Sequence, residues 1–350
     1  MGFKITSKNF AALADFLANK IEKTGAITFS DFIEICLYDP EYGFYTKNGA
    51  PGRRGDFLTS PEVGPLFGSL LANWLDEVWS KLGKPKDFVV IEVGAGRGTL
   101  ARSIKSAKPL CLIEGKYVMV ERSEVLRKEQ PTSPNFVSTS KMPESPFNGA
   151  VIANELLDNF PFDLLAVDQN CWREVCVGKD KNFFLEVLGK VRKAPRGVPL
   201  IPNSRIPIQY ESSKWVKNTL KMLFSGSLLV IDYASTTEEM SKRPQDSWLR
   251  TYCKHKNGGP LLENPGGQDI TVEVAIDQLP IGATICTQRE FLEKHGIADL
   301  VNEGRKTWND RSSIGDLKAV KARSRIIEAE ALIDLEGLGN FTVLEWSVGY

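Results

Sequence analysis

The sequence predicts an α/β fold in which helices pack on a parallel β-sheet. Three apolar runs carry this prediction, because each is followed by glycine or polar residues where a parallel strand would leave the sheet: Phe88–Val93, Gly149–Ala153 and Gly226–Ile231. The runs are rich in valine and isoleucine, as strands covered on both faces are. A segment with apolar residues at helical spacing, Tyr210–Phe224, precedes the third run.

Helices are expected before the first of these strands. Apolar residues recur at helical spacing from about Asn9 to Lys23 and again from Phe32 to Leu37. A third helix should run from Ser60 to about Leu82, with Ser60 as its N-cap and Pro61 at its first helical position.

The later part of the chain is expected to interrupt the sheet and then complete it. Short strand-like runs with charged turns mark an inserted β-rich segment at about 163–208. Beyond the third parallel strand we expect two helices, a long helix and a last strand, at Val272–Leu279, Gln288–His295, about Leu317–Leu335 and Phe341–Val348. On this basis residues 1–86 form a helical N-terminal extension with an active-site loop, and residues 87–350 form the main domain with the insertion.

The first apolar strand ends in a turn that contains three glycines. They are spaced Gly94-x-Gly96-x-Gly98, whereas a dinucleotide-binding turn reads Gly-x-Gly-x-x-Gly. Glu92 lies just upstream, and Glu121 ends the next expected strand, where a carboxylate can bind a ribose diol. Because S-adenosyl-L-methionine (SAM) carries a sulfonium and an ammonium but no phosphate, nearby carboxylates suit it. We therefore expect these five residues to bind SAM; the alternative is a turn that only joins a strand to a helix.

Polar residues also follow the second of the parallel strands. Asn154, Glu155 and Asp158 come directly after Gly149–Ala153. Since the carboxyl ends of neighbouring parallel strands face one crevice, these side chains should lie beside the glycine turn, with Asn154 near the cofactor. Two carboxylates and an amide are costly to bury unless they hold a polar group. The alternative is that the carboxylates cap the next turn or pair with lysine or arginine.

Two loops supply further candidates. Thr59 and Ser60 follow a long segment rich in glycine, proline and aromatic residues, and such loops usually move or bind. We expect both residues to contact the cofactor, although helix capping alone would also explain them. His255 is a secondary candidate as a general base, since a histidine flanked by lysines is more often exposed and inactive.

Composition argues against several classes of protein. The 44 lysines and arginines balance 44 aspartates and glutamates, so nucleic acid is not an expected partner. Six cysteines form no Cys-x-x-Cys pair and only two histidines are present, so no metal site is expected. No apolar run approaches the ~18 residues of a membrane span. Because no arginine-rich presequence is visible, we expect a cytoplasmic protein.

Five motifs, in this order, resemble those of the MidA-like family of SAM-dependent methyltransferases: Tyr38–Tyr45, Gly55–Glu62, Glu92–Leu100, Asn154–Asp158 and Ile231–Tyr233. The similarity extends from roughly Thr28 to Gly296. The resemblance implies a class I methyltransferase fold with a Rossmann-like sheet of seven strands, SAM as the cofactor and a protein arginine as the methyl acceptor. Eukaryotic members are mitochondrial assembly factors of respiratory complex I, so a complex I subunit is one expected substrate.

For such a substrate, Glu155 and Asp158 are the residues we expect to hold the guanidinium, because two carboxylates match its planar fork. Two other functions remain open. The chain could be a SAM-binding assembly factor or chaperone whose catalysis is dispensable. It could also be a nicotinamide-dependent oxidoreductase, which the glycine spacing disfavours.

Overall fold

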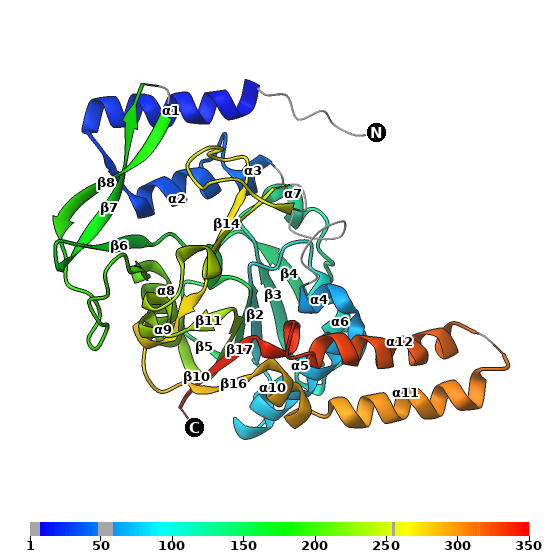
Figure 1. The fold of residues 1–350 in the computed structure, drawn as a ribbon. Coiled ribbons are helices and arrows are strands. Elements are labelled where there is room, and N and C mark those ends of the chain that lie inside the picture. Colours follow the sequence, from blue (N-terminus) through cyan, green and yellow to red (C-terminus); the bar gives the residue numbers. More distant parts are fainter. Residues whose placement is uncertain (1–7, 48–58, 182, 254–255, 315, 350) are drawn as a thin grey trace.

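A seven-stranded β-sheet lies at the centre of the computed structural model, which describes residues 8–47, 59–181, 183–253, 256–314 and 316–349 (Figure 1). The strand order is β16-β17-β10-β5-β2-β3-β4. Five consecutive strands of the sheet are parallel to one another: β2 (Val89–Val93), β3 (Lys116–Val120), β4 (Phe136–Thr139), β5 (Phe147–Asn154) and β10 (Leu223–Asp232). The last two, β16 (Thr284–Thr287) and β17 (Thr342–Val348), add to the edge antiparallel. The predicted Rossmann-like sheet is confirmed.

Helices cover both faces of this sheet because alternate residues of each buried strand point to opposite sides. Val90 packs with Trp74 on the face covered by α5 (Pro65–Lys81), α6 (Thr99–Ala107) and α10 (Gln288–Lys294). Its neighbour Ile91 packs with Val216 on the face covered by α8 (Tyr210–Met222). The hydrophobic clusters on the two faces both include residues of the central strands. This packing fixes the positions of the carboxyl ends of β2, β3, β5 and β10 relative to one another.

The N-terminal extension and the inserted segment share one core. The extension comprises α1 (Lys8–Thr24), β1 (Ile27–Thr28), α2 (Phe29–Tyr38) and α3 (Phe44–Lys47). The insertion forms an antiparallel sheet of β6 (Asp163–Asp168), β7 (Cys171–Asp180), β8 (Phe183–Val191) and β9 (Arg205–Ile208). Ile27 of β1 pairs with Val177 of β7, and Leu13, Phe32 and Val177 are buried in the same cluster. The two segments therefore pack together above the sheet in the view of Figure 1.

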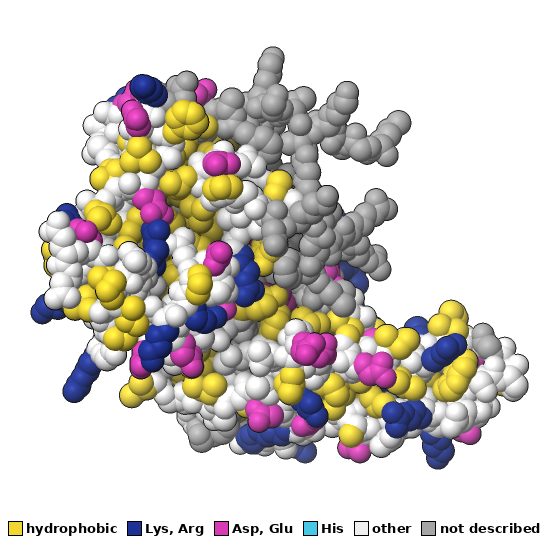
Figure 2. Space-filling view, viewed as in Figure 1, with side chains coloured by type: hydrophobic (Ala, Val, Ile, Leu, Met, Phe, Trp, Pro, Cys, Tyr) yellow, Lys and Arg dark blue, Asp and Glu magenta, His cyan; other side chains and the backbone are white. Residues whose placement is uncertain are grey.

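Two antiparallel helices, α11 (Ile297–Arg311) and α12 (Leu317–Ile333), form an arm that extends to one side of the sheet (Figure 1). Basic and acidic side chains are intermixed over this arm and the elements beside it in Figure 2. Within the described ranges no helix has the length and apolar content to cross a membrane. The remaining elements are short: α4 (Ser60–Val63), α7 (Glu124–Arg127), α9 (Thr237–Ser241), β11 (Ala234–Ser235), β12 (Leu249–Cys253), β13 (Lys256–Asn257), β14 (Asp269–Val272) and β15 (Val274–Ala275).

Two expected helices differ from the structure. The helix expected from Ser60 to Leu82 is interrupted at Gly64, because Pro65 disfavours a helical residue before it. The Glu328 carboxylate of α12 fills the space beside Gly64 and accepts a hydrogen bond from the Leu66 N–H at 2.9 Å. Thr59, and not Ser60, occupies the N-cap position of α4.

The helix expected over Val272–Leu279 is also wrong. The segment forms the end of β14, the short strand β15 and a single 3₁₀ turn, Ile276–Gln278. Ile270 and Val272 are buried at alternate positions of β14, and β14 pairs with β12. This alternation and pairing favour a strand up to Val272, where helical spacing alone predicted the start of a helix.

Candidate functional site

The glycine turn lies at the carboxyl end of β2, in the middle of the sheet. Gly94, Gly96 and Gly98 have φ angles of +72°, +52° and +75°, which residues with a Cβ rarely adopt. A Cβ on Gly98 would lie 2.6 Å from the Pro131 Cδ, whereas a Cβ on Gly96 would meet no atom within 4 Å. Gly98 is therefore required by packing. Gly96 faces open space and lets a bound molecule approach the backbone.

The Glu121 carboxylate is fixed at this turn. It follows β3, and its Oε2 accepts a hydrogen bond from the Gly96 N–H at 3.0 Å while its Oε1 accepts one from the Ser123 N–H at 2.8 Å. Each carboxylate oxygen has lone pairs for a further donor, so Glu121 can also accept ribose hydroxyls. The exposed Gly94, the open space at Gly96 and this carboxylate together fit SAM.

The structure places Glu92 in the protein interior, next to Glu121. The Glu92 side chain is 6% exposed, and its Oε2 accepts a hydrogen bond from the Tyr117 hydroxyl at 2.8 Å. Burial raises the pKa of Glu92 to about 8, and the nearby Glu121 charge adds to the effect while the Tyr117 hydrogen bond opposes it. A direct contact of Glu92 with the cofactor remains a prediction.

We expect the Glu92→Gln substitution to stabilise the fold increasingly as the pH rises from 5 to 8. Folded Glu92 holds a proton up to about pH 8, whereas the unfolded side chain loses it near pH 4.5, so this group destabilises the wild type progressively across that window. Glutamine keeps an acceptor for Tyr117 but does not ionise. The difference in Tm between variant and wild type should grow by about 5 °C, measured by scanning calorimetry. A difference that does not change with pH would contradict a protonated Glu92.

Glu155 directly follows β5, at the carboxyl end of the parallel strands. Glu155 has φ +48°, a strained value for a residue with a Cβ, and its N–H donates to the Ile231 carbonyl at 2.8 Å. The Asn154 Nδ2 donates to the Glu155 Oε1 at 3.0 Å. The Ser60 backbone N–H also hydrogen-bonds to this carboxyl group. The structure thus brings the predicted residues Ser60, Asn154 and Glu155 together.

Thr59 and Ser60 differ in what their side chains do. Thr59 makes no capping hydrogen bond, so helix capping does not explain its side chain. The Ser60 hydroxyl donates to the Gln288 Oε1 at 2.8 Å inside the protein, and only its backbone N–H reaches the site. A cofactor contact by either residue remains a prediction.

Asp158 lies beside Glu155 and is 4% exposed. Its Oδ1 is buried and has no hydrogen-bond partner among the described residues, and the same holds for the Asn154 Oδ1. Burial raises the pKa of Asp158 well above its usual range, and the neighbouring Asp232, Glu155 and Asp269 add to this effect. Burial, with Asp232 as the next cause, raises the pKa of Glu155 to about 8. The charges acting most strongly on both groups are thus carboxylates, and among the described residues the cluster lacks a cation.

Sequence reasoning missed two acids of this cluster as site residues. Asp232 was visible as a polar residue at a strand end, but its contacts were not. Asp269 comes from β14 and accepts hydrogen bonds from the Tyr45 hydroxyl at 2.9 Å and from the Asn159 Nδ2 at 3.3 Å. No spacing in the sequence relates Asp269 to the glycine turn. The candidate base His255 lies outside the described residues.

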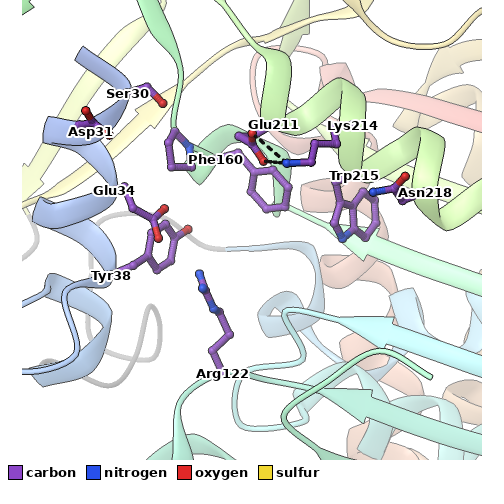
Figure 3. Close-up of a pocket in the computed structure, with 11 residues that line it drawn as sticks. Ser30, Asp31, Glu34, Tyr38, Arg122, Phe160, Glu211, Lys214, Trp215 and Asn218 are labelled. Atoms are coloured by element: carbon purple, nitrogen blue, oxygen red, sulfur yellow. Dashed lines mark hydrogen bonds and ion pairs between the residues drawn. The ribbon is translucent and has the colours of Figure 1, made fainter. Parts of the chain in front are cut away.

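A cavity of about 470 Å³ adjoins the loop that carries Asp158 (Figure 3). Phe160 and Pro161 of that loop form one wall, and α2, α8 and Arg122 form the rest. Arg122, the residue after Glu121, directs its guanidinium toward the Tyr38 ring, with the Cζ 4.9 Å from the ring centroid. The Tyr38 hydroxyl donates to the Asn159 carbonyl at 3.0 Å, so the extension is attached to the loop that carries the carboxylates.

Known proteins share both the sequence pattern and the fold of this chain. Residues 70–296 match the family described as "Putative S-adenosyl-L-methionine-dependent methyltransferase". A crystal structure from Burkholderia thailandensis, of a superfamily member bound to S-adenosyl-homocysteine, is similar over 99% of this chain and 95% of that chain, with a TM-score of 0.83 and 27% identity.

Curated relatives are similar over most of their length. The mouse protein arginine methyltransferase NDUFAF7, mitochondrial, is 41% identical over 80% of this chain and 73% of its own length. The human protein of that name is 28% identical over 75% of this chain and 67% of its own length. Because these relatives are named mitochondrial, the expectation of a cytoplasmic protein is wrong. That expectation rested on not finding a presequence, and this absence does not determine where a protein resides in the cell.

Proposed function

The chain belongs to the MidA-like family of SAM-dependent methyltransferases, and from this membership we propose that it methylates arginine side chains of a protein substrate. The names of the curated relatives, which are protein arginine methyltransferases, support this acceptor. A complex I subunit as the particular substrate stays a prediction.

One observation favours a guanidinium over other acceptors. Glu155 and Asp158 lie together at the end of β5, with an unpaired buried oxygen on Asp158 and further carboxylates behind them. A cation is the group that such a cluster would stabilise most, because it offsets both the burial and the repulsion of the carboxylates. A guanidinium also supplies planar N–H donors that match two carboxylates.

SAM, when bound, supplies an electrophilic methyl group, and its transfer to a guanidinium nitrogen forms an N–C bond, breaks the S–C bond and releases S-adenosyl-homocysteine and one proton. We assign Gly94, Gly96 and Glu121 to the cofactor, and Gly98 to the shape of the turn, which it sets by packing against Pro131. Glu155 and Asp158 would hold the guanidinium in one orientation, which is the main requirement of an in-line displacement. A carboxylate that hydrogen-bonds to the reacting nitrogen can accept the proton that the methylated nitrogen loses, so Glu155 or Asp158 would serve as the proton acceptor.

Arginine specificity can be tested before the substrate is identified. The purified protein is incubated with SAM that carries a deuterated methyl group and with an extract of cells that lack the protein, and the labelled residues are located by mass spectrometry. We expect the label on arginine. A peptide around the labelled site should then be methylated at least about 100-fold faster than the same peptide with lysine, because the fork of carboxylates matches only the guanidinium. Label on lysine or on a carboxylate would refute an arginine acceptor.

A further inference from the structure

Asp232, the last residue of β10, hydrogen-bonds to the loop that carries the carboxylates. Its side chain is fully buried. The Oδ2 accepts hydrogen bonds from three consecutive backbone N–H groups, those of Leu156 at 3.2 Å, Leu157 at 2.9 Å and Asp158 at 3.3 Å. The Oδ1 accepts a hydrogen bond from the Tyr233 N–H at 2.9 Å. Both carboxylate oxygens are therefore used by the backbone.

These contacts continue a pairing that starts on the strands. Asn154 is in register with Ile231, and the Ile231 carbonyl accepts the Glu155 N–H at 2.8 Å. The end of β10 thus binds the N–H groups of residues 155–158 in succession. Glu155 has φ +48° within this stretch, a strained conformation that persists only where the surroundings impose it.

We infer that Asp232 is a positioning residue, which fixes the backbone of residues 155–158 so that the Glu155 and Asp158 carboxylates converge on the substrate. The catalytic part of this inference rests on the proposed function, whereas the loop geometry does not. Asp232 does not need to touch the substrate, since its oxygens face the backbone of the loop.

Burial raises the pKa of Asp232 to about 7, and the charge that Asp232 carries above this pH has a second consequence. It is the largest electrostatic cause, after burial, of the raised pKa values of Glu155 and Asp158. A neutral residue at this position would not repel the two carboxylates. An asparagine, however, has one acceptor oxygen, so it cannot serve both the three loop N–H groups and the Tyr233 N–H.

The test compares Asp232→Asn with Asp76→Asn. Asp76 is a matched control, because both of its carboxylate oxygens also accept backbone N–H groups, those of Leu110 at 2.9 Å and Cys111 at 2.8 Å, but where α5 meets the 3₁₀ turn Leu110–Leu112. In Asp232→Asn we expect hydrogen exchange of the amides of residues 156–158 to accelerate at least about tenfold, measured by NMR with SAM bound. SAM affinity, measured by calorimetry, should stay within about threefold of the wild type, because the N–H groups of Gly94 and Gly96 bind Val120 and Glu121 and not Asp232. The control should change neither.

Methylation of the peptide identified for the wild type supplies the second measurement. Asp232→Asn should lower kcat at least about tenfold, and should move the acid limb of the rate profile to lower pH by about one unit, because Glu155 and Asp158 lose a repelling neighbour. Asp76→Asn should leave that limb in place even if it lowers Tm. Unchanged exchange at residues 156–158, or an unshifted limb, would overturn the inference. Exchange needs no substrate, so faster exchange in Asp232→Asn would support the loop role even if the wild type methylated no arginine.

Discussion

A Gly96→Val variant should lose SAM affinity by at least about 100-fold while it still folds. Gly96 has φ +52°, and a Cβ there would meet no protein atom within 4 Å, so the new side chain would occupy the open space that we assign to the cofactor. The same backbone group holds Glu121 through the N–H that donates to its Oε2 at 3.0 Å, so a distorted turn also displaces this carboxylate. Both losses act on ligand binding. Isothermal titration with SAM and with NADH measures the effect and also excludes or supports a nicotinamide cofactor.

The matched control is Gly25→Val. Gly25 has φ +79° and likewise no atom within 4 Å of an added Cβ, but it lies between α1 and β1 in the N-terminal extension. Both variants therefore carry the strain of a branched residue in the left-handed region, and both should lose stability. Only Gly96→Val should lose SAM. Undiminished SAM affinity in that variant would place the cofactor elsewhere.

The same variant separates an enzyme from an assembly factor with dispensable catalysis. If the cellular role requires methyl transfer, cells that carry Gly96→Val should resemble cells without the protein. Full function in those cells, with SAM binding lost in vitro, would favour the assembly factor. Gly25→Val serves as the control for reduced stability.

Local patterns predicted the parts of the fold that local chemistry determines. The β-branched run before Gly94 predicted β2, and the polar residues after Ala153 predicted that β5 ends at the same edge. The glycine spacing and Glu121 predicted a turn with a carboxylate beside it, which the Gly96–Glu121 hydrogen bond shows. These signals lie within a few residues of the structure that they specify.

Contacts between distant segments could not be predicted in this way. The break at Gly64 depends on Glu328, which is supplied by a helix near the other end of the chain. One hydrogen-bond partner of Asp269 is Tyr45, 224 residues away in sequence. The sequence places Asp232 directly after the predicted strand Gly226–Ile231. The three hydrogen bonds that its Oδ2 accepts depend on the sharp turn at Glu155, which no single-residue preference indicates. The acidic cluster is therefore a property of the tertiary fold.

Replacing Glu155 with glutamine should lower kcat for arginine methylation about 10²- to 10³-fold, the range seen when one group aimed at a reacting charge is removed. Glutamine has nearly the same shape, and its oxygen can still accept hydrogen bonds from the Asn154 Nδ2 and the Ser60 N–H. What it lacks is the charge that would pair with a guanidinium. SAM affinity should be unchanged, since the glycine turn and Glu121 lie on other strands. Single-turnover kinetics and calorimetry measure the two quantities.

Glu345→Gln is the control for loss of a hydrogen-bonded glutamate. Glu345 lies on β17 opposite the middle of β10, and its Oε1 accepts hydrogen bonds from the Trp74 Nε1 of α5 at 2.9 Å and from the Ser227 Oγ at 3.1 Å. The control variant should retain kcat. The dependence on pH sharpens the comparison: with the pKa of Glu155 raised to about 8, the wild-type rate should increase as this carboxyl group ionises, whereas Glu155→Gln should lose that component of the profile. If Glu155→Gln kept both the rate and the profile of the wild type, Glu155 would serve the turn after β5 and Asp158 alone would remain to hold the substrate.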